Sequence, residues 1–338
     1  MIRRPRPSLA RHAAIPGATL VDPVATIPTW LRRAVPDAQS LAKKDFEDVA
    51  LAAGAAICLL DQVVRRHERW AGAWRQRLAL SAAAATMKQA GRIEDEAALR
   101  DAVLLTKAGD DVGPAGRLLL AWRRLAARPA GDLLTAKSLA AVLGEFSYAP
   151  DEEVVNDLAD ELRQLGACDG TVGMLTGAFI AAERHAFDRT VGAWLADALL
   201  AQRLGWAHSV PLLGAEAAVG ASARLRRPTT GSGATSTETH LERAKGLLAA
   251  QARAALRAID LSAELGRRAD RLLAVAPKLR AKAADAVVDK LLSDDAIVAS
   301  EKIAGMSDRG LRRLFDRLVE FGAVRELSGR PTFRIYGL

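Results

Sequence analysis

The chain has 338 residues, enough for two or three domains with hydrophobic cores of their own. Half of the residues are hydrophobic but only 4% are aromatic, which favours long helices packed through alanine and leucine. The net charge of +8 is compatible with a polyanionic partner such as DNA. The two cysteines lie far apart, which excludes a disulfide framework and fits a reducing cytoplasm. The longest charge-free apolar stretches are about a dozen residues, too short to cross a bilayer.

The first two thirds of the chain are predicted to be helical. Residues 1–25 contain arginines interrupted by prolines and no apolar segment, so we expect a basic flexible tail and not a secretory signal. Residues 26–221 are expected to form an alanine-rich helical body, because their apolar residues recur at helical spacing. No segment alternates between apolar and polar residues for long enough to predict a β-strand. The expected helices cover 45–74, 78–90, 94–106, 114–127, 136–143, 152–165, 174–187 and 190–204.

The composition changes after the body. Residues 227–239 are small and polar, and the sequence therefore predicts a flexible linker over 222–240. A long connecting helix is expected over 241–277, ended by Pro277. Lys and Arg outnumber Asp and Glu by 19 to 13 from residue 241 onward, so most of the positive excess falls in this part of the chain.

The most informative pattern lies in residues 278–338, which begin with a further helix over 278–292. Ser307 is a suitable N-cap for a helix over 308–322, which Gly322 ends. At 3.6 residues per turn this helix has two chemically different faces. The apolar face consists of Leu311, Leu314, Phe315, Leu318 and Val319, and the basic face of Arg309, Arg312, Arg313 and Arg317.

A β-hairpin is predicted after this helix. Residues 323–327 and 332–336 have β-branched and aromatic content, and a turn over 328–331 places Arg330 at the hairpin tip. In a helix-turn-helix another helix comes just before the recognition helix, and residues 299–305 are the segment in that position. This segment is shorter than such a helix usually is. The overall class is therefore mainly all-α, with a C-terminal winged helix-turn-helix-like module. We expect DNA to contact Arg309, Arg312, Arg313, Arg317 and Arg330, with the helix in a major groove.

A second hypothesis is a helical scaffold whose winged-helix end binds protein. Arginines on a surface helix commonly form a solvated face, and here Asp316 can pair with Arg312 or Arg313. Winged-helix folds also serve as protein-interaction modules. Under either hypothesis we expect the helical body to act as a dimerisation or partner-binding domain.

A third hypothesis, an enzyme, has little support. No phosphate-binding loop, dinucleotide motif or nucleophile elbow is present, and the five histidines lack metal-ligand spacing. We therefore expect no enzyme, no catalytic residue, no cofactor and no bound metal. The remaining candidate is an acidic stretch that could hold a divalent cation, formed by Glu94, Asp95, Glu96, Asp101, Asp110 and Asp111. Anions at a helix N-terminus and an i,i+4 pair of Glu96 with Arg100 explain it more simply.

Several segments together resemble one family. They include WAGAWRQRLAL from Trp70, GRIEDEAALRDA from Gly91, the segment 109–122, WLAD from Trp194 with 203–206 and 210–213, 273–280, and SDRGLRRLFDRLVEFG from Ser307. The pattern is similar to the alphaproteobacterial domain-of-unknown-function family numbered 1403, over nearly the whole chain. The resemblance implies a cytoplasmic bacterial protein, and it supplies no activity and no catalytic residues to carry over.

Overall fold

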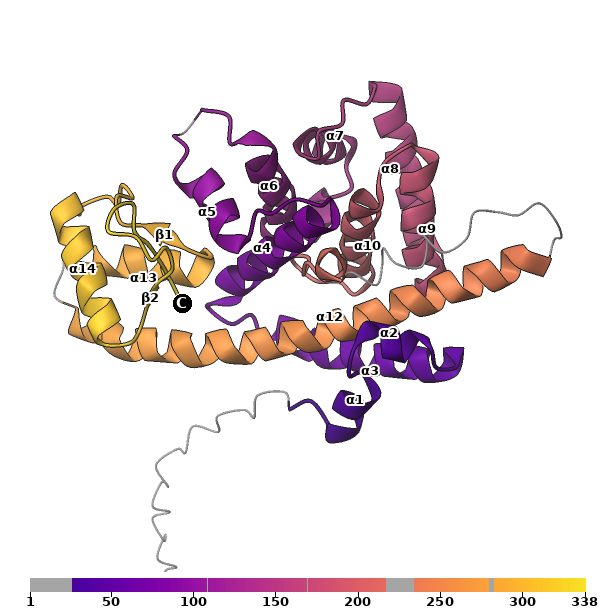
Figure 1. Cartoon of the computed structure of the whole chain (residues 1–338), viewed down its shortest axis with the longest axis horizontal. Coiled ribbons are helices and arrows are strands. Elements are labelled where there is room, and N and C mark those ends of the chain that lie inside the picture. Colours follow the sequence, from indigo (N-terminus) through magenta and orange to yellow (C-terminus); the bar gives the residue numbers. More distant parts are fainter. Residues whose placement is uncertain (1–25, 108, 169, 217–233, 280–282) are drawn as a thin grey trace, which may run out of the picture.

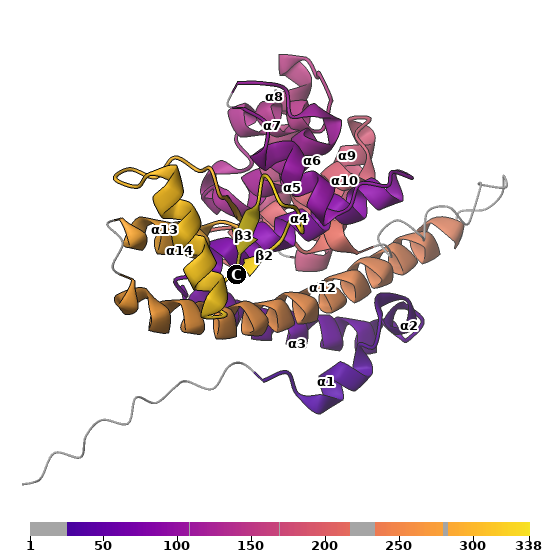
Figure 2. The same ribbon diagram turned by 60° about the vertical axis from the view of Figure 1, so that its left-hand side comes forward.

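The computed structural model describes residues 26–107, 109–168, 170–216, 234–279 and 283–338, with the backbone alone for 234–239. The described chain is mainly helical and has one small sheet near its C-terminal end. Figure 1 shows the long helix α12 (Ala234–Val275) running along the molecule, with the first helices on one side of it and most of the other helices on the opposite side. The C-terminal elements gather at one end of α12 (Figures 1 and 2).

Most helices of the body lie where the sequence predicts them. Asp37, Asp95 and Asp188 cap three of them, each accepting a hydrogen bond from a backbone N–H of the first turn. The helices are α1 (Thr29–Ala34), α2 (Ala38–Ala42), α3 (Phe46–Arg65), α4 (Ala71–Gln89), α5 (Glu96–Leu104), α6 (Gly113–Ala127), α7 (Ala136–Glu145), α8 (Glu152–Ala167), α9 (Thr171–Arg184) and α10 (Arg189–Arg203). Two short 3-10 helices, η1 (Ala130–Asp132) and η2 (Leu213–Ala215), lie among them.

The prediction of one helix over 45–74 is wrong. Helix α3 ends at Arg65 and α4 begins at Ala71. Between them His67 has a φ of 49°, a left-handed conformation that cannot continue a right-handed helix. Trp74 is nevertheless buried, and its Nε1 donates a hydrogen bond to the carbonyl oxygen of Ala258 at 2.9 Å. This bond joins α4 to α12.

Helix α12 organises the core because small side chains let other helices approach it closely. It packs most extensively on α3 and α2. Alanines make up half of its buried positions and half of those of α3. At 1.5 Å per residue its 42 residues span about 63 Å. One helix therefore contacts both the body and the C-terminal elements.

Part of the predicted linker is helical. Residues 234–239 belong to α12, although their small, polar composition predicts an exposed loop. Residues 217–233 of this region, and the predicted basic tail over 1–25, lie outside the described residues. The long helix predicted over 241–277 is confirmed up to Val275, where the 3-10 helix η3 (Ala276–Lys278) replaces it at Pro277.

The C-terminal elements combine two helices with a three-stranded sheet. In chain order they are α13 (Ala284–Ser293), β1 (Ile297–Val298), α14 (Asp308–Glu320), β2 (Arg325–Glu326) and β3 (Ile335–Gly337). The strand order is β1-β3-β2, and β3 is antiparallel to both neighbours. Ile297 lies opposite Tyr336, and Arg325 lies opposite Gly337. Below, residues 284–338 are called the C-terminal module.

Two predictions for this module need correction. Residues 299–305 contain turns and no helix, so the expected first helix of a helix-turn-helix is absent from this stretch. Val319, which the helical pattern places on the buried face of α14, is 40% exposed. The predicted hairpin exists, with shorter strands than expected, and the two-residue strand β1 was not predicted.

The module packs on the body through a close contact between α4 and α13. At Gly72 an added Cβ atom would lie 2.7 Å from the carbonyl oxygen of Ser293, nearer than real Cβ atoms approach. Only glycine fits there without moving one of the two helices.

Cys58 and Cys168 are both free and exposed. Within the described residues no helix combines the length and apolar character needed to cross a membrane.

Candidate nucleic-acid interface

Helix α14 carries the predicted interface, and its start is fixed by a capping interaction. The Ser307 Oγ accepts a hydrogen bond from the Gly310 backbone N–H at 3.2 Å, as the sequence predicts. Leu311, Leu314, Phe315 and Leu318 are buried. The Phe315 ring stacks on Tyr336 of β3, with ring centroids 4.3 Å apart and planes 5° from parallel. This apolar face holds α14 against the sheet and directs the opposite face outward.

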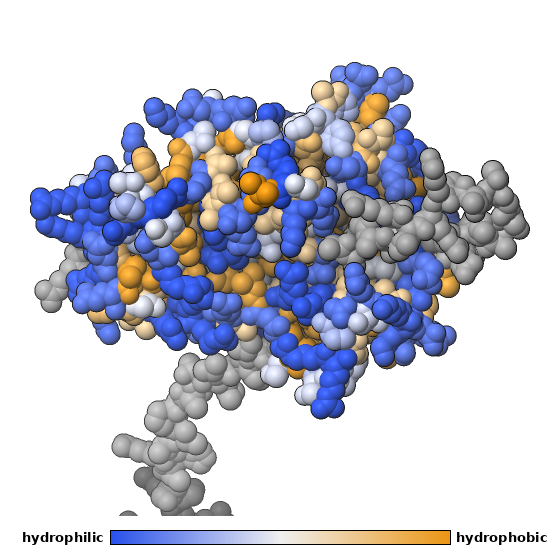
Figure 3. All heavy atoms as spheres, in the orientation of Figure 1, coloured by the Kyte–Doolittle hydropathy of each residue, from blue (hydrophilic) through white to orange (hydrophobic). Residues whose placement is uncertain are grey.

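The outward face is basic and open. Arg309, Arg312 and Arg313 are exposed, and none of them forms an ion pair with the described part of the chain. The guanidinium of Arg317 lies over the ring of Phe321, 5.4 Å from its centroid. Helix α14 lies at the outer end of the molecule in Figures 1 and 2, and the same end is largely hydrophilic in Figure 3.

The carboxylate on this face pairs differently from the sequence-based expectation. Asp316 could have paired with Arg312 or Arg313, but its nearest ionic partner is Arg334 on the hairpin, at 3.9 Å. Arg312 and Arg313 are therefore left without an anionic neighbour within ion-pair distance among the described residues. Both guanidinium groups are available to an external anion.

Arg330, predicted at the tip of a free wing, is instead bound to the helical body. Its Nη2 donates a hydrogen bond to the carboxylate of Asp101 on α5. The loop between β2 and β3 thus bends toward α5, while Arg334 connects the end of the same loop to α14. The structure brings four of the five predicted arginines onto one helix face and places the fifth in a contact between module and body.

A buried ionic cluster at this boundary was not predicted. Asp295, just before β1, has a fully buried side chain and accepts hydrogen bonds from Arg77 of α4 and Arg100 of α5. The Arg100 Nε lies 2.6 Å from its Oδ2. Burial raises the pKa of Asp295, but the charges and hydrogen bonds of the two arginines outweigh it and hold that pKa below its ordinary value. The cluster fixes the module on the body.

The backbone at the end of β3 extends this contact. The carbonyl oxygen of Leu338 accepts hydrogen bonds from Arg268 of α12 at 3.0 Å and from Arg77 at 3.4 Å. The sequence predicts only a loop at Asp294 and Asp295. Nothing in the two neighbouring aspartates indicates that Asp295 is buried.

The module as a whole has no excess of positive charge. Residues 284–338 contain nine Lys and Arg and nine Asp and Glu. The excess expected from residue 241 onward therefore belongs to the segment 241–283. The net charge of the module therefore does not attract an anion, and any attraction must come from the exposed arginines on α14.

Comparison with known families identifies the chain. A family model described as a protein of unknown function, DUF1403, matches residues 18–338. The chain belongs to this family. No curated protein and no solved structure matches it.

The DUF1403 match includes the acidic stretch that was considered as a cation site. In the structure five of its six carboxylates have separate partners. Glu94 pairs with Arg92, Asp95 caps α5, Glu96 lies 3.7 Å from Arg100, Asp101 holds Arg330, and Asp111 lies 3.5 Å from Arg117. Across the residues that the structure describes, no three His, Cys, Asp or Glu side chains are grouped to hold a metal ion.

Proposed function

We propose that this DUF1403 protein binds DNA through its C-terminal module, with α14 as the recognition helix. The order of elements supports this proposal. A winged helix places its recognition helix between the first and second strands and orders the strands first-third-second, and the module has that arrangement. Residues 327–334, between β2 and β3, would be the wing. We propose a cytoplasmic location, where such a protein meets bacterial DNA.

The observation that carries the proposal is the set of unpaired arginines at the start of α14. Arg309, Arg312 and Arg313 are exposed at the end of the helix that a recognition helix inserts first. Arginine binds phosphate oxygens and guanine edges through two parallel hydrogen bonds. Several arginines without ion-pair partners on one helix face can therefore contact DNA when the helix lies in a major groove. Arg317 follows one turn later and would reach the adjacent backbone.

The module departs from a regular helix-turn-helix in two ways that bear on how it would dock. Residues 299–305 supply no helix to cross the DNA backbone. Arg330 is bound to Asp101, so it can reach a phosphate only after leaving that carboxylate. We therefore assign most of the affinity to α14 and a smaller share to the wing.

Fluorescence anisotropy of the full chain with a mixed pool of duplexes, between 50 and 200 mM salt, tests the proposal. Each phosphate contact contributes about 0.9 to the slope of log affinity against log salt. The double variant Arg312→Ala, Arg313→Ala should therefore flatten the slope by about 1–2 if both residues contact phosphate. If they contact bases instead, it should reduce sequence preference by about 1–3 kcal/mol for each lost pair of hydrogen bonds.

A matched control removes the same charge elsewhere. Lys43 and Lys44 are exposed neighbours at the end of α2, and Lys43→Ala, Lys44→Ala changes the net charge equally. That variant should bind DNA like the wild type. If the wild type shows no salt-sensitive binding, or both double variants lose affinity equally, α14 does not bind DNA.

A protein partner for the module is the second candidate function. Val319, in the last turn of α14, is 40% exposed, and Phe321, the C-cap residue that follows the helix, is 42% exposed. Exposed apolar side chains next to arginines also suit a protein interface. A module that binds no DNA in the anisotropy experiment would favour this candidate.

We also propose that the helical body mediates self-association or binding to a partner. Leu51 on α3 is 66% exposed, on a helix that carries no charge between Asp48 and Asp61. Sedimentation equilibrium of the full chain and of Leu51→Glu tests self-association. A wild-type monomer at all concentrations would contradict the dimer.

A further inference from the structure

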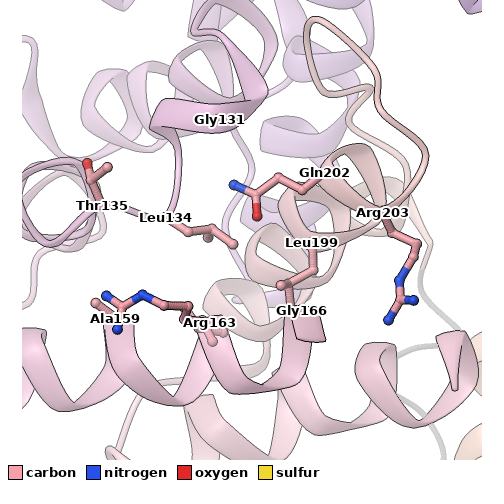
Figure 4. Close-up of a pocket in the computed structure, with 10 residues that line it drawn as sticks. Gly131, Leu134, Thr135, Ala159, Arg163, Gly166, Leu199, Gln202 and Arg203 are labelled. Atoms are coloured by element: carbon pink, nitrogen blue, oxygen red, sulfur yellow. The ribbon is translucent and has the colours of Figure 1, made fainter. Parts of the chain in front are cut away.

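The helical body contains a cavity on elements other than those of the proposed DNA interface. It has a volume of about 540 Å³ and opens between η1, the start of α7, α8 and α10. Sites for small organic molecules are usually about 300–1,000 Å³. Figure 4 shows the cavity, which is lined by Gly131, Leu134, Thr135, Ala159, Leu162, Arg163, Gly166, Leu199, Gln202 and Arg203.

The middle of the cavity is apolar with one polar group directed into it. Leu134 and Leu199 lie at the centre of the view in Figure 4, and the Gln202 amide points between them from α10. The Gln202 Nε2 donates a hydrogen bond to the carbonyl oxygen of Ala130 at 2.8 Å. This bond fixes the orientation of the amide and leaves its oxygen free to accept from a ligand.

The charged groups of the lining are both cationic. In Figure 4 the guanidinium groups of Arg163 and Arg203 lie on opposite sides of the cavity, and its lining, among the residues that the structure describes, contains no carboxylate. Arg163 pairs with Asp160 on its own helix at 2.5 Å. Arg203 donates to the carbonyl oxygen of Cys168 and has no ionic partner within the described ranges. The net positive charge of the cavity therefore lies at Arg203.

Two glycines keep the cavity open. A Cβ atom added at Gly166, on α8, would meet only the Cδ2 of Leu199, at 3.8 Å, which is an ordinary van der Waals distance. A Cβ atom added at Gly131 would meet nothing within 4 Å. A larger side chain at position 166 can therefore fill the cavity while the backbone stays in place.

We propose that this cavity binds a small organic anion with an apolar body. Its anionic group is held by Arg203, and its apolar part packs against Leu134, the leucine of the lining that is partly exposed. The lining combines apolar and polar side chains in similar shares, and ligand sites likewise use a few fixed polar groups to set the orientation of a ligand. The inference does not depend on DNA binding, because the cavity and α14 share no residue.

A pair of fluorescent probes that differ in one charged group tests the proposal. 8-Anilinonaphthalene-1-sulfonate is an apolar ring system with a sulfonate, and N-phenyl-1-naphthylamine is the same ring system without it. Fluorescence titration of the full chain should give one saturable site, with the sulfonate bound about tenfold more tightly because a charge-assisted hydrogen bond is strong. Equal affinities for the two probes would overturn the assignment of an anionic ligand.

Three variants separate the parts of the site. Arg203→Met should raise the dissociation constant of the sulfonate about tenfold and leave that of the neutral probe unchanged. Arg163→Met, which removes an arginine already paired, should have a smaller effect. Gly166→Leu should raise the dissociation constants of both probes at least about tenfold, because the leucine fills the cavity. It should not destabilise α8, since leucine favours helices.

Gly54→Leu provides the control for an added leucine. Gly54 lies on α3, and a Cβ atom there would meet nothing within 4 Å. This variant should bind both probes like the wild type. If Gly166→Leu melts like the wild type and still binds the probes with wild-type affinity, the cavity is not the site and the proposal is wrong.

Discussion

The arginines around the C-terminal module fall into two groups with opposite environments. Arg77 and Arg100 belong to the body and enclose Asp295, whose side chain is fully buried. Arg312 and Arg313 belong to α14, are exposed and have no anionic partner among the described residues. A charge removed from water needs a partner, whereas a solvated charge can remain unpaired. The first group therefore holds the module in place, and the second is free to bind something else.

Removing the buried carboxylate should have the largest effect. Asp295→Ala leaves Arg77 without its anion and Arg100 with Glu96 alone, at 3.7 Å. Removing one partner of a buried ion pair in this way costs about 3–5 kcal/mol of unfolding free energy. Urea denaturation followed by circular dichroism measures it. The control is Asp289→Ala, which removes an exposed partner of Arg69 and should change stability by about 0–1 kcal/mol. Equal losses in the two variants would show that burial does not distinguish the pairs.

Two adjacent residues of α14 should separate stability from binding. Leu314 is buried against the sheet, and Leu314→Ala should lower the free energy of unfolding by about 2–5 kcal/mol. Arg313 is exposed, and Arg313→Ala should change it by at most about 0.5 kcal/mol. DNA affinity at a temperature where both variants are folded should fall for Arg313→Ala alone. The opposite order of effects would mean that the two faces of α14 are assigned wrongly.

A second buried carboxylate shows what the arginines do for Asp295. Asp197 of α10 is buried without a cation beside it and accepts backbone hydrogen bonds from Leu212 and Leu213. Burial raises its pKa from 3.8 to about 8, although these hydrogen bonds oppose the shift. The pKa of Asp295 moves in the opposite direction because of Arg77 and Arg100.

The two carboxylates should therefore affect stability in opposite pH ranges. The folded state keeps Asp197 protonated, so its contribution is full below pH 3.8 and is lost as the pH rises toward 8. The loss is at most about 1.4 kcal/mol for each pH unit. Asp295 contributes above its unfolded pKa, and that contribution is lost as the pH falls through its lowered folded value.

Asp197→Asn isolates the first effect, since an amide oxygen can accept the same hydrogen bonds without ionising. Urea denaturation at pH 5 and pH 8 should show a smaller loss of stability with rising pH in this variant than in the wild type. The same pH dependence in both proteins would mean that Asp197 is ionised in the folded state.

The contact between the wing and the body should give the smallest effect. Arg330 and Asp101 are both partly exposed, and a double-mutant cycle with Arg330→Ala and Asp101→Ala should give a coupling energy of about 0.2–1 kcal/mol. Asp101→Ala should also leave Arg330 free and so raise DNA affinity slightly. A fall in DNA affinity in that variant would show that the contact with α5 supports the wing.

The sequence predicts features that depend on neighbours along the chain and misses those that depend on distant residues. The spacing of Leu311, Leu314 and Leu318 predicts α14, and Ser307 predicts its start, because helical periodicity and capping act within a few residues. Strand β1 has two residues and becomes a strand only by pairing with β3. Two residues are too few to show the alternation of apolar and polar side chains that predicts a strand.

The same reason explains what was missed in the candidate site. Arg330 and Asp101 are 229 positions apart, and Arg77 and Asp295 are 218 apart. Sequence reasoning places Arg330 at a hairpin tip but cannot know which surface the hairpin meets. It predicts the arginine face of α14, which one helix determines alone, and it fails for each contact that two parts of the fold form together.

The close packing at Gly72 has a consequence for how this family can diverge. An added methyl group there would collide with the Ser293 carbonyl, so a relative with any other residue at this position must hold α13 farther from α4. Position 72 therefore limits how closely α4 and α13 can approach, although the two helices lie more than 190 residues apart in the chain. In an alignment of relatives, glycine at position 72 would mark the chains that keep this close contact between the body and α13.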